Sequence, residues 1–230
     1  MGTRSVICIW YKGRFVVAQY TQFDGYPEGQ GIKILKFLAA PGNVERLKAG
    51  LEHVKIISEE EHNEIAEKVE EDTRAKQAAG AQILQFDFSG RSEFDRAFPS
   101  LSRLAGGRIL ELVAQGTAEK PTMIYMDLGF VNDALFCEWA YCVDLDSGVF
   151  EVFGGGTSKE QSGSKRFQDV GEPDAPVPRL VKSFSFDNLP KDQDEFIDIL
   201  NVALEGPQEA RDGEQVQGQQ EEAQTAEDND

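Results

Sequence analysis

The sequence lacks any apolar run near the roughly 20 residues that a membrane-spanning helix requires. Its apolar start, residues 6–11, is also too short for the hydrophobic segment of a secretory signal. Basic residues are scarce, because 23 Lys and Arg stand against 41 Asp and Glu and the formal net charge is -18. A strongly acidic chain repels nucleic-acid backbones and anionic membranes. We therefore expect no nucleic-acid partner, no membrane association, and a location in the cytosol or nucleus.

Cysteine and histidine, which dominate metal sites and nucleophilic catalysis, are few. Cys8, Cys137 and Cys142 are an odd number without the spacing of a disulfide framework, which is typical of free thiols in a reducing compartment. Cys137 and Cys142 are five positions apart on one expected strand, so side-chain alternation places them on opposite faces. His53 and His62 accompany no HExxH or CxxC motif, and no glycine motif for phosphate is present. The sequence therefore predicts neither a metal nor a cofactor.

Two pairs of β-branched and aromatic segments, each joined by a short turn containing glycine, predict β-hairpins. The segments 5–11 and 14–21 are separated only by Lys12-Gly13, a dipeptide suited to a tight turn with positive φ. The segments 136–145 and 149–153 repeat the pattern. The first strand is apolar at nearly every position, which indicates an interior strand, whereas the second alternates and fits a sheet edge.

Periodicity supplies the remaining elements. We predict helices at 32–38, 43–54, 58–79, 108–115 and 189–204, strands at 123–126 and 180–186, and a short strand or helix at 83–88. Asn43 and Ser58 are the expected N-caps of the second and third helices. Within the second hairpin, aromatic and apolar side chains from Trp139 to Leu145 share one face, while Glu138, Ala140, Cys142 and Asp144 share the other. This alternation predicts a half-buried sheet.

Together these patterns predict an α+β fold, with a mostly antiparallel sheet built from two hairpins and helices packed mainly on one face. Residues 1–205 form a single domain, and the Gly-, Ser- and Pro-rich residues 154–179 form a flexible loop within it. Residues 206–230 have almost no apolar side chain, so burial cannot offset the entropy of ordering them. We expect a disordered acidic tail there, and docking of that tail on a basic partner is one functional hypothesis.

The most unusual segment is Phe23–Gly31, where glycines and a proline interrupt aromatic and acidic residues between a strand and a helix. Such a backbone bends sharply or approaches another group closely. Residues of and beside this segment carry groups suited to a small cationic or hydroxyl-rich ligand: Tyr20, Asp24, Tyr26, Glu28 and Gln30. The competing interpretation is a structural Ω-like loop. We favour a non-catalytic module that binds a small polar or cationic ligand, or a protein, through this loop.

An alternative is a small hydrolase or transferase that uses the loop carboxylates. Asp24 or Glu28 would then face a second acid, for which Asp127, Asp133 and Glu138 are the candidates. One acid of the pair would need a pKa raised by burial. No complete catalytic set can be assembled from the sequence, so the catalytic residues stay unassigned.

Two segments carry a resemblance to a known family. Met1-Gly-Thr-Arg4 with the first hairpin and Phe23–Gly31, and Glu138–Asp146 leading into Phe150–Phe153, resemble an uncharacterised protein family of filamentous fungi that has bacterial and phage relatives. Ser5 stands where that family is expected to carry glycine. The resemblance implies a fungal source and one domain that unites both hairpins. No activity is known for the family, so the resemblance transfers no catalytic residue.

Overall fold

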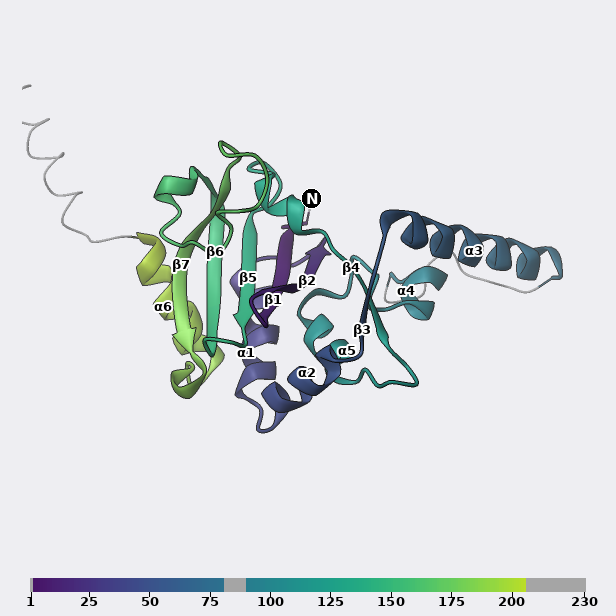
Figure 1. The fold of residues 1–230 in the computed structure, drawn as a ribbon, viewed down its shortest axis with the longest axis horizontal. Coiled ribbons are helices and arrows are strands. Elements are labelled where there is room, and N and C mark those ends of the chain that lie inside the picture. Colours follow the sequence, from purple (N-terminus) through teal and green to yellow (C-terminus); the bar gives the residue numbers. More distant parts are fainter. Residues whose placement is uncertain (1, 81–89, 206–230) are drawn as a thin grey trace, which may run out of the picture.

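The computed structural model of the protein describes residues 2–80 and 90–205, so the element expected at 83–88 and the tail 206–230 lie outside the described residues (Figure 1). The strands are β1 (Ser5–Tyr11), β2 (Arg14–Thr21), β3 (Val54–Ile57), β4 (Thr122–Tyr125), β5 (Trp139–Asp144), β6 (Val149–Thr157) and β7 (Val177–Ser185). The helices are α1 (Ile32–Ala39), α2 (Asn43–Leu51), α3 (Glu59–Ala78), α4 (Glu93–Ala97), α5 (Ile109–Ala114) and α6 (Gln193–Glu205).

The first hairpin forms as predicted, with β1 antiparallel to β2. Lys12 and Gly13 both have positive φ, 53° and 74°, the combination that matches the twist of the flanking strands. The N–H groups of both turn residues donate to the Asp146 carboxylate, each at 2.9 Å. Because Asp146 lies in the turn between β5 and β6, it ties the turns of the two hairpins together.

The two hairpins join into one five-stranded sheet of order β2-β1-β5-β6-β7 (Figure 1). Neighbouring strands are antiparallel except β1 and β5, which run parallel with Ser5 opposite Trp139. The predicted α+β fold with a mostly antiparallel sheet is confirmed, as are the interior position of β1 and the edge position of β2. The edge position matters for function because β2 has one row of backbone groups without a strand partner.

A second, two-stranded sheet was not predicted. β3 and β4 pair in parallel, apart from the five-stranded sheet, so the strand expected at 123–126 does not join the main sheet. The helix predicted over 43–54 is wrong at its end, since α2 stops at Leu51 and Val54 begins β3. Asn43 does not cap this helix either, because its side chain donates to a backbone carbonyl of α1. Local periodicity did not reveal β3, because the partner strand that stabilises it is distant in the sequence.

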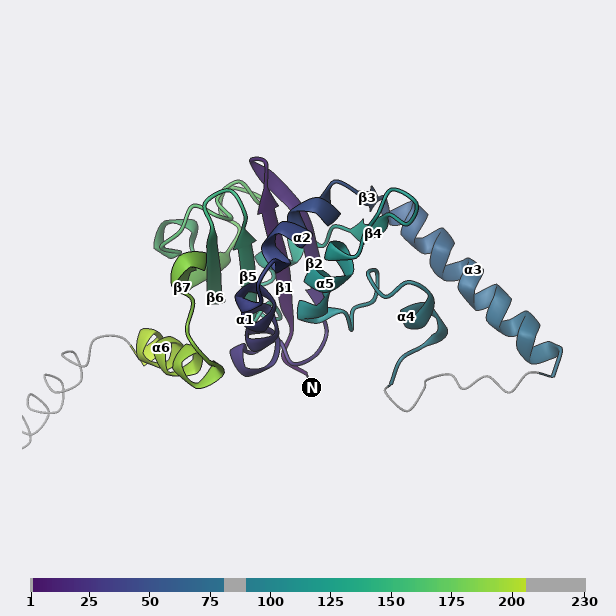
Figure 2. The same ribbon diagram turned by 90° about the horizontal axis from the view of Figure 1, so that it is seen from below.

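Helices cover one face of the five-stranded sheet, as predicted. α1, α2, α5 and α6 lie on this face (Figure 2), and their apolar sides meet alternate residues of the strands. The contributing buried side chains include Ile7, Ile9, Ile34, Leu47, Ile109, Leu110, Tyr141, Val143, Phe150, Phe196 and Leu200.

α3 differs from the other long helices because it buries no residue and projects away from the sheet (Figure 1). Its first turn is stabilised by the predicted capping box, in which Ser58 and Glu61 exchange hydrogen bonds between side chain and backbone. In the part of the chain that the structure describes, no helix combines the length and the apolar character needed to cross a membrane.

The opposite face of the sheet is also covered, which corrects the prediction of a half-buried sheet. Cys142 and Asp144, which point to this face of β5, are only 0% and 2% exposed. The cover is the chain between β6 and β7, where buried Phe167 packs on Phe153 with ring centroids 5.0 Å apart. The segment expected to be a loop from residue 154 therefore begins inside β6 and then packs on the sheet.

Arg166 fastens this covering segment to the strands beneath it. Its guanidinium forms ion pairs with Asp144 and Glu151, and the Nε–Oε2 distance to Glu151 is 2.7 Å. The three side chains are 13%, 3% and 11% exposed, so these ion pairs are largely shielded from water.

The three cysteines share the apolar cluster under the covering segment. Cys8, Cys137 and Cys142 are all buried there and all free. The prediction that Cys137 and Cys142 occupy opposite faces is wrong, because β5 begins at Trp139 and the alternation of the strand does not extend back to Cys137.

Candidate functional site

The loop that follows β2, residues 22–31, is held tightly against the N-terminal strand. Gly25 donates its N–H to Thr3 O at 2.8 Å, and a Cβ on Gly25 would stand 2.8 Å from that same oxygen. A Cβ on Gly29 would lie 2.1 Å from Asp24 O. The buried Tyr141 hydroxyl donates to Gly25 O at 2.7 Å. These two glycines therefore serve close contacts within the protein.

Gln30, one of the predicted ligand-binding residues, is buried and used by the fold. The residue is only 4% exposed. The Nε2 group donates to Phe23 O at 3.0 Å, and Oε1 accepts the Gly107 N–H at 2.8 Å. Gln30 therefore fastens the loop to the segment that precedes α5.

Asp24, Tyr26 and Glu28 lie on the outer surface of the loop. The Tyr26 hydroxyl donates to Asp24 Oδ1 at 3.3 Å, and the negative charge of Asp24 together with this hydrogen bond raises the pKa of that hydroxyl. Neither these three residues nor Gln30 lines the cleft beside β2, whereas Tyr20 does. The structure thus separates the predicted site residues into a surface group, a buried structural residue and one cleft residue.

A cleft of about 750 Å³ lies beside the free edge of β2, and we call it the β2 cleft. Its walls come from four separate parts of the chain: the end of β2 and the residues after it, α3 through His62 and Ala66, the segment 90–104, and the residues Tyr125 and Asp127 at the end of β4. A cleft of this size is large enough for a small organic molecule.

The backbone edge of β2 is capped where it forms the cleft wall. Asp127 donates its N–H to Ala18 O at 2.8 Å, and its Oδ2 accepts the Tyr20 N–H at 3.4 Å. Two residues further on, Gln22 donates its N–H to Arg103 O at 3.1 Å. The edge that would otherwise template strand addition is therefore closed, and side chains of the capping segments face the cleft.

Asp127 and Asp95 are acids of the β2 cleft whose pKa values are shifted in opposite directions. Burial raises the pKa of the Asp127 carboxyl above the ordinary value, although the Tyr20 N–H and the neighbouring side chains of His62 and Arg103 act in the opposite direction. Asp95, the other acid of the cleft, accepts hydrogen bonds from Ser92 and Ser102. Burial raises the pKa of Asp95 as well, but these hydrogen bonds outweigh it and the net pKa is lowered. Asp127 is therefore the cleft carboxyl with acceptor capacity to spare.

Aromatic rings form much of the remaining wall. His62 stands between two of them, with its ring centroid 5.0 Å from that of Tyr125 and 5.6 Å from that of Phe94. Tyr20 is fixed by an edge-to-face contact with Phe130 at 4.8 Å and by a hydrogen bond to Gln22. These rings offer flat apolar surface beside the Asp127 carboxyl, a combination typical of small-molecule sites.

Gln19 adds an unusual polar group to the same cleft. The residue is 3% exposed and lines the cleft. Its Nε2 donates to Ser102 O at 3.1 Å, but its Oε1 has no hydrogen-bond partner among the residues that the structure describes. A buried acceptor without a donor is costly, so its presence in a cleft needs an explanation.

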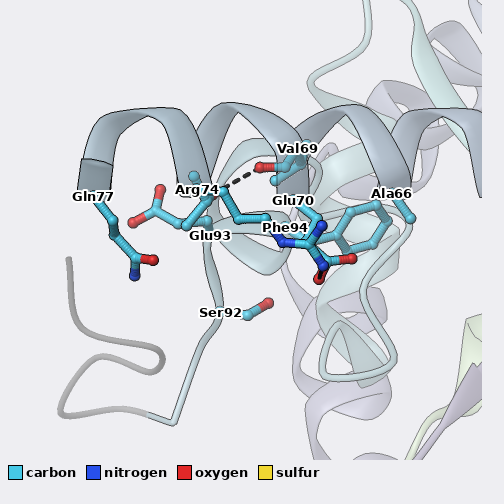
Figure 3. A pocket seen from close by; sticks show the side chains of 9 residues that line it. Ala66, Val69, Glu70, Arg74, Gln77, Ser92, Glu93 and Phe94 are labelled. Carbon is cyan, nitrogen blue, oxygen red and sulfur yellow. Dashed lines mark hydrogen bonds and ion pairs between the residues drawn. The ribbon is translucent and has the colours of Figure 1, made fainter. Parts of the chain in front are cut away.

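A second hollow adjoins the β2 cleft between α3 and α4, with a volume of about 470 Å³ (Figure 3). It shares Ala66, Ser92 and Phe94 with the β2 cleft. Two of its charged side chains, Arg74 and Glu70, pair with each other along α3, and Glu93 pairs with Arg96 on α4. The hollow borders a helix with no buried residue, and none of the described residues that line it is a buried titratable group, so we place the candidate site in the β2 cleft.

The other acids considered for catalysis have structural roles. Asp133 Oδ1 accepts the N–H groups of Leu135 and Phe136, at 3.1 Å and 2.9 Å. Glu138 Oε1 accepts the Arg4 N–H at 3.2 Å. Neither lines the β2 cleft. Within residues 2–80 and 90–205, no group of three or more His, Cys, Asp or Glu side chains is placed to hold a metal ion.

Sequence reasoning named Tyr20 and Asp127 separately but did not place them together. It gave no role in a site to Gln19, His62 and Tyr125, because the cleft walls meet only through β3, β4 and the packing of α3. The one sequence feature that pointed to the cleft was Asp127, an acidic residue two positions after the end of β4. No protein-family model, no curated protein and no solved structure matches the chain, so the site must be judged from its own chemistry.

Proposed function

We propose that the protein is a non-catalytic binding module whose β2 cleft takes a small ligand with a polar or cationic group. One observation carries the proposal: the Asp127 carboxyl is held in a cleft of about 750 Å³, where its contact with the Tyr20 N–H is a long 3.4 Å. Binding sites commonly combine apolar walls with a few polar groups of this kind. The proposal keeps Tyr20 as a site residue and moves the acidic contact from Asp24 and Glu28 to Asp127.

A hydrolase or transferase remains the second candidate, because a carboxyl with a raised pKa is suited to general acid catalysis. Its support is narrower. The loop acids Asp24 and Glu28 do not line the cleft, and Asp95 is occupied by its serine neighbours. Among the residues that the structure describes, a paired-carboxylate mechanism would therefore lack its second free acid, and we favour binding over catalysis.

We also propose that the protein acts in the cytosol or nucleus, since its three cysteines are all free thiols. The resemblance to an uncharacterised fungal family attributes no activity to the cleft residues. Support for binding therefore comes from the chemistry of the cleft.

A thermal-shift screen of a metabolite library tests the proposal on wild type, Asp127→Asn and Asp24→Asn. The first variant keeps the size of the side chain and removes its charge. The second is a matched control, because Asp24 is exposed and asparagine tolerates its φ of 54°. A ligand at one hundred times its dissociation constant stabilises a protein by about 2.7 kcal/mol, which is roughly 5–10 °C at this chain length.

We expect ligands that shift wild type and Asp24→Asn alike and that lose their effect on Asp127→Asn. Ligands lost only in Asp24→Asn would contradict the β2 cleft and return the site to the loop surface. Chemical conversion of a ligand by the wild-type protein, followed by mass spectrometry, would favour the catalytic candidate instead.

A further inference from the structure

The polar groups that line the β2 cleft differ in whether the protein already uses them. Tyr20 donates its hydroxyl to Gln22 Oε1 at 2.6 Å, which occupies both groups. Both carboxylate oxygens of Asp95 accept hydrogen bonds from serine side chains, Oδ2 from Ser92 and Oδ1 from Ser102. These groups are therefore committed to the fold, and a ligand would have to compete with short intramolecular contacts.

Two of the lining groups are hydrogen-bond acceptors with capacity left among the described residues. Asp127 has a carboxylate whose Oδ2 receives only the long 3.4 Å contact from Tyr20 N–H. Gln19 is only 3% exposed, and its Oε1 has no hydrogen-bond partner among the described residues. Asp127 is only partly buried, so its carboxylate can accept hydrogen bonds from a ligand that supplies donors, whereas the Gln19 oxygen is shielded by the fold.

The charge of the cleft points the same way. Its lining holds Asp95 and Asp127 against Arg103, so with His62 counted as neutral the net charge is negative. Arg103 is exposed, and its backbone oxygen is the part that contacts Gln22. The whole chain carries a formal net charge of -18, which favours the approach of a cation.

The aromatic lining also suits a cation. Tyr20, Phe23, Phe94 and Tyr125 all line the cleft, and the faces of such rings attract positive charge. Phe23 is 50% exposed, so part of its ring is open to a ligand. A flat apolar body between these rings would bury that surface.

Resting on the proposed function, we propose that the ligand is an alkylamine with a flat, aromatic or aliphatic body, which binds as an ammonium cation. Its apolar body lies against Tyr20, Phe23 and Tyr125. Its ammonium group donates hydrogen bonds to the Asp127 carboxylate. This assignment excludes carboxylates and phosphates as preferred ligands, because Arg103, at the exposed side, is the one Lys or Arg among the described residues that line the cleft.

Three probes of matched shape test the assignment: naphthylmethylamine, naphthylmethanol and naphthoate. Each is titrated into the full-length ¹⁵N-labelled protein, and amide chemical shifts report both the site and the dissociation constant. We expect the amine to bind about ten-fold more tightly than the alcohol, since a hydrogen bond to a charged partner is stronger than a neutral one. Asp127→Asn should reduce amine binding to the level of the alcohol and leave alcohol binding unchanged.

The outcomes separate the two proposals. If the three probes shift the amides of the cleft with equal affinity, or if naphthoate binds best, the amine assignment is overturned while ligand binding in the cleft stands. If no probe shifts the cleft amides at millimolar concentration, both proposals fail. The ranking of the probes on the wild-type protein decides the matter even if Asp127→Asn fails to fold.

Discussion

Replacing Arg166 by methionine tests how the segment between β6 and β7 is held on the sheet. Methionine keeps a long flexible side chain and removes the positive charge between Asp144 and Glu151. The side chains of Arg166, Asp144 and Glu151 are 13%, 3% and 11% exposed, respectively. The substitution therefore leaves two negative charges close together and largely shielded from water.

The expected cost follows from the partners that remain. Breaking a buried ion pair by removing one member costs about 3–5 kcal/mol. Asp144 keeps two backbone donors, the N–H groups of Asp146 and Ser147, both at 2.9 Å, which reduces its share. Glu151 loses its charged partner. We expect Arg166→Met to lower the free energy of unfolding by about 3 kcal/mol, and we expect the neutral triple variant with Asp144→Asn and Glu151→Gln to recover at least half of that loss.

The pH dependence has a definite sign. In the wild type, burial raises the pKa of Asp144, but the backbone donors and Arg166 lower it more, so the net pKa is below its ordinary value. Burial keeps the pKa of Glu151 raised even with Arg166 present. Without Arg166, both folded-state pKa values rise, so the folded variant binds more protons than the folded wild type as the pH falls. Its deficit relative to wild type should therefore shrink as the pH falls from neutral toward about 5.

Urea denaturation followed by tryptophan fluorescence measures both effects. Trp10 is a local probe, because its ring centroid lies 5.1 Å from the Arg166 Cζ. Arg179→Met in β7 is the matched control, since Arg179 is exposed and its loss should change stability by less than about 0.5 kcal/mol. A loss below about 1 kcal/mol for Arg166→Met, with no dependence on pH, would refute the reasoning that this ion-pair cluster anchors the segment.

Three further predictions address the loop, the cleft and α3. Gln30→Leu leaves Gly107 N–H and Phe23 O without their partner and should lower the free energy of unfolding, measured in urea, by about 1–3 kcal/mol. Tyr26→Phe, on the exposed surface of the loop, is the control and should change the free energy of unfolding little. Equal losses in the two variants would contradict the structural role of Gln30. Asp127→Asn should raise the thermal midpoint at neutral pH, because the pKa of Asp127 is raised in the folded state and its charged form therefore destabilises the fold. This advantage over the wild type should vanish below about pH 4, where the Asp127 carboxyl is protonated in both the folded and the unfolded chain. A lower midpoint than the wild type at neutral pH would contradict the prediction. Ser58→Ala removes the cap of α3 and should lower the local stability of its first turn by about 1 kcal/mol, which amide exchange reports as faster exchange there. The thermal midpoint of the whole protein should stay unchanged, because α3 buries no residue.

The elements predicted correctly from the sequence are those whose cause is local. Lys12-Gly13 specifies a turn with positive φ, and the structure has φ of 53° and 74° there. Ser58 and Glu61 specify a helix start within four residues. Local sequence patterns did not predict β3, because its four residues are stabilised by pairing in parallel with β4, which is distant in the sequence. Val54 was therefore counted as the last residue of a helical stripe.

The covering segment between β6 and β7 was misjudged for a similar reason. Its glycines, serines and charged residues resemble a solvated loop, but Phe167 and Arg166 are both taken up by the sheet. The polar partners of Arg166 lie on two different strands, so their meeting is a property of the folded sheet. The candidate site shows the same limit, since the residue types at Tyr20 and Asp127 were visible while their convergence was not.

The most direct test of the central claim is a crystal structure of the protein soaked with naphthylmethylamine. Binding in the β2 cleft predicts density for the ring system against Tyr20 and Tyr125, with the amine nitrogen about 2.7–2.9 Å from an Asp127 carboxylate oxygen. Density for the probe on the loop surface near Asp24 and Glu28, with an empty cleft, would contradict the claim.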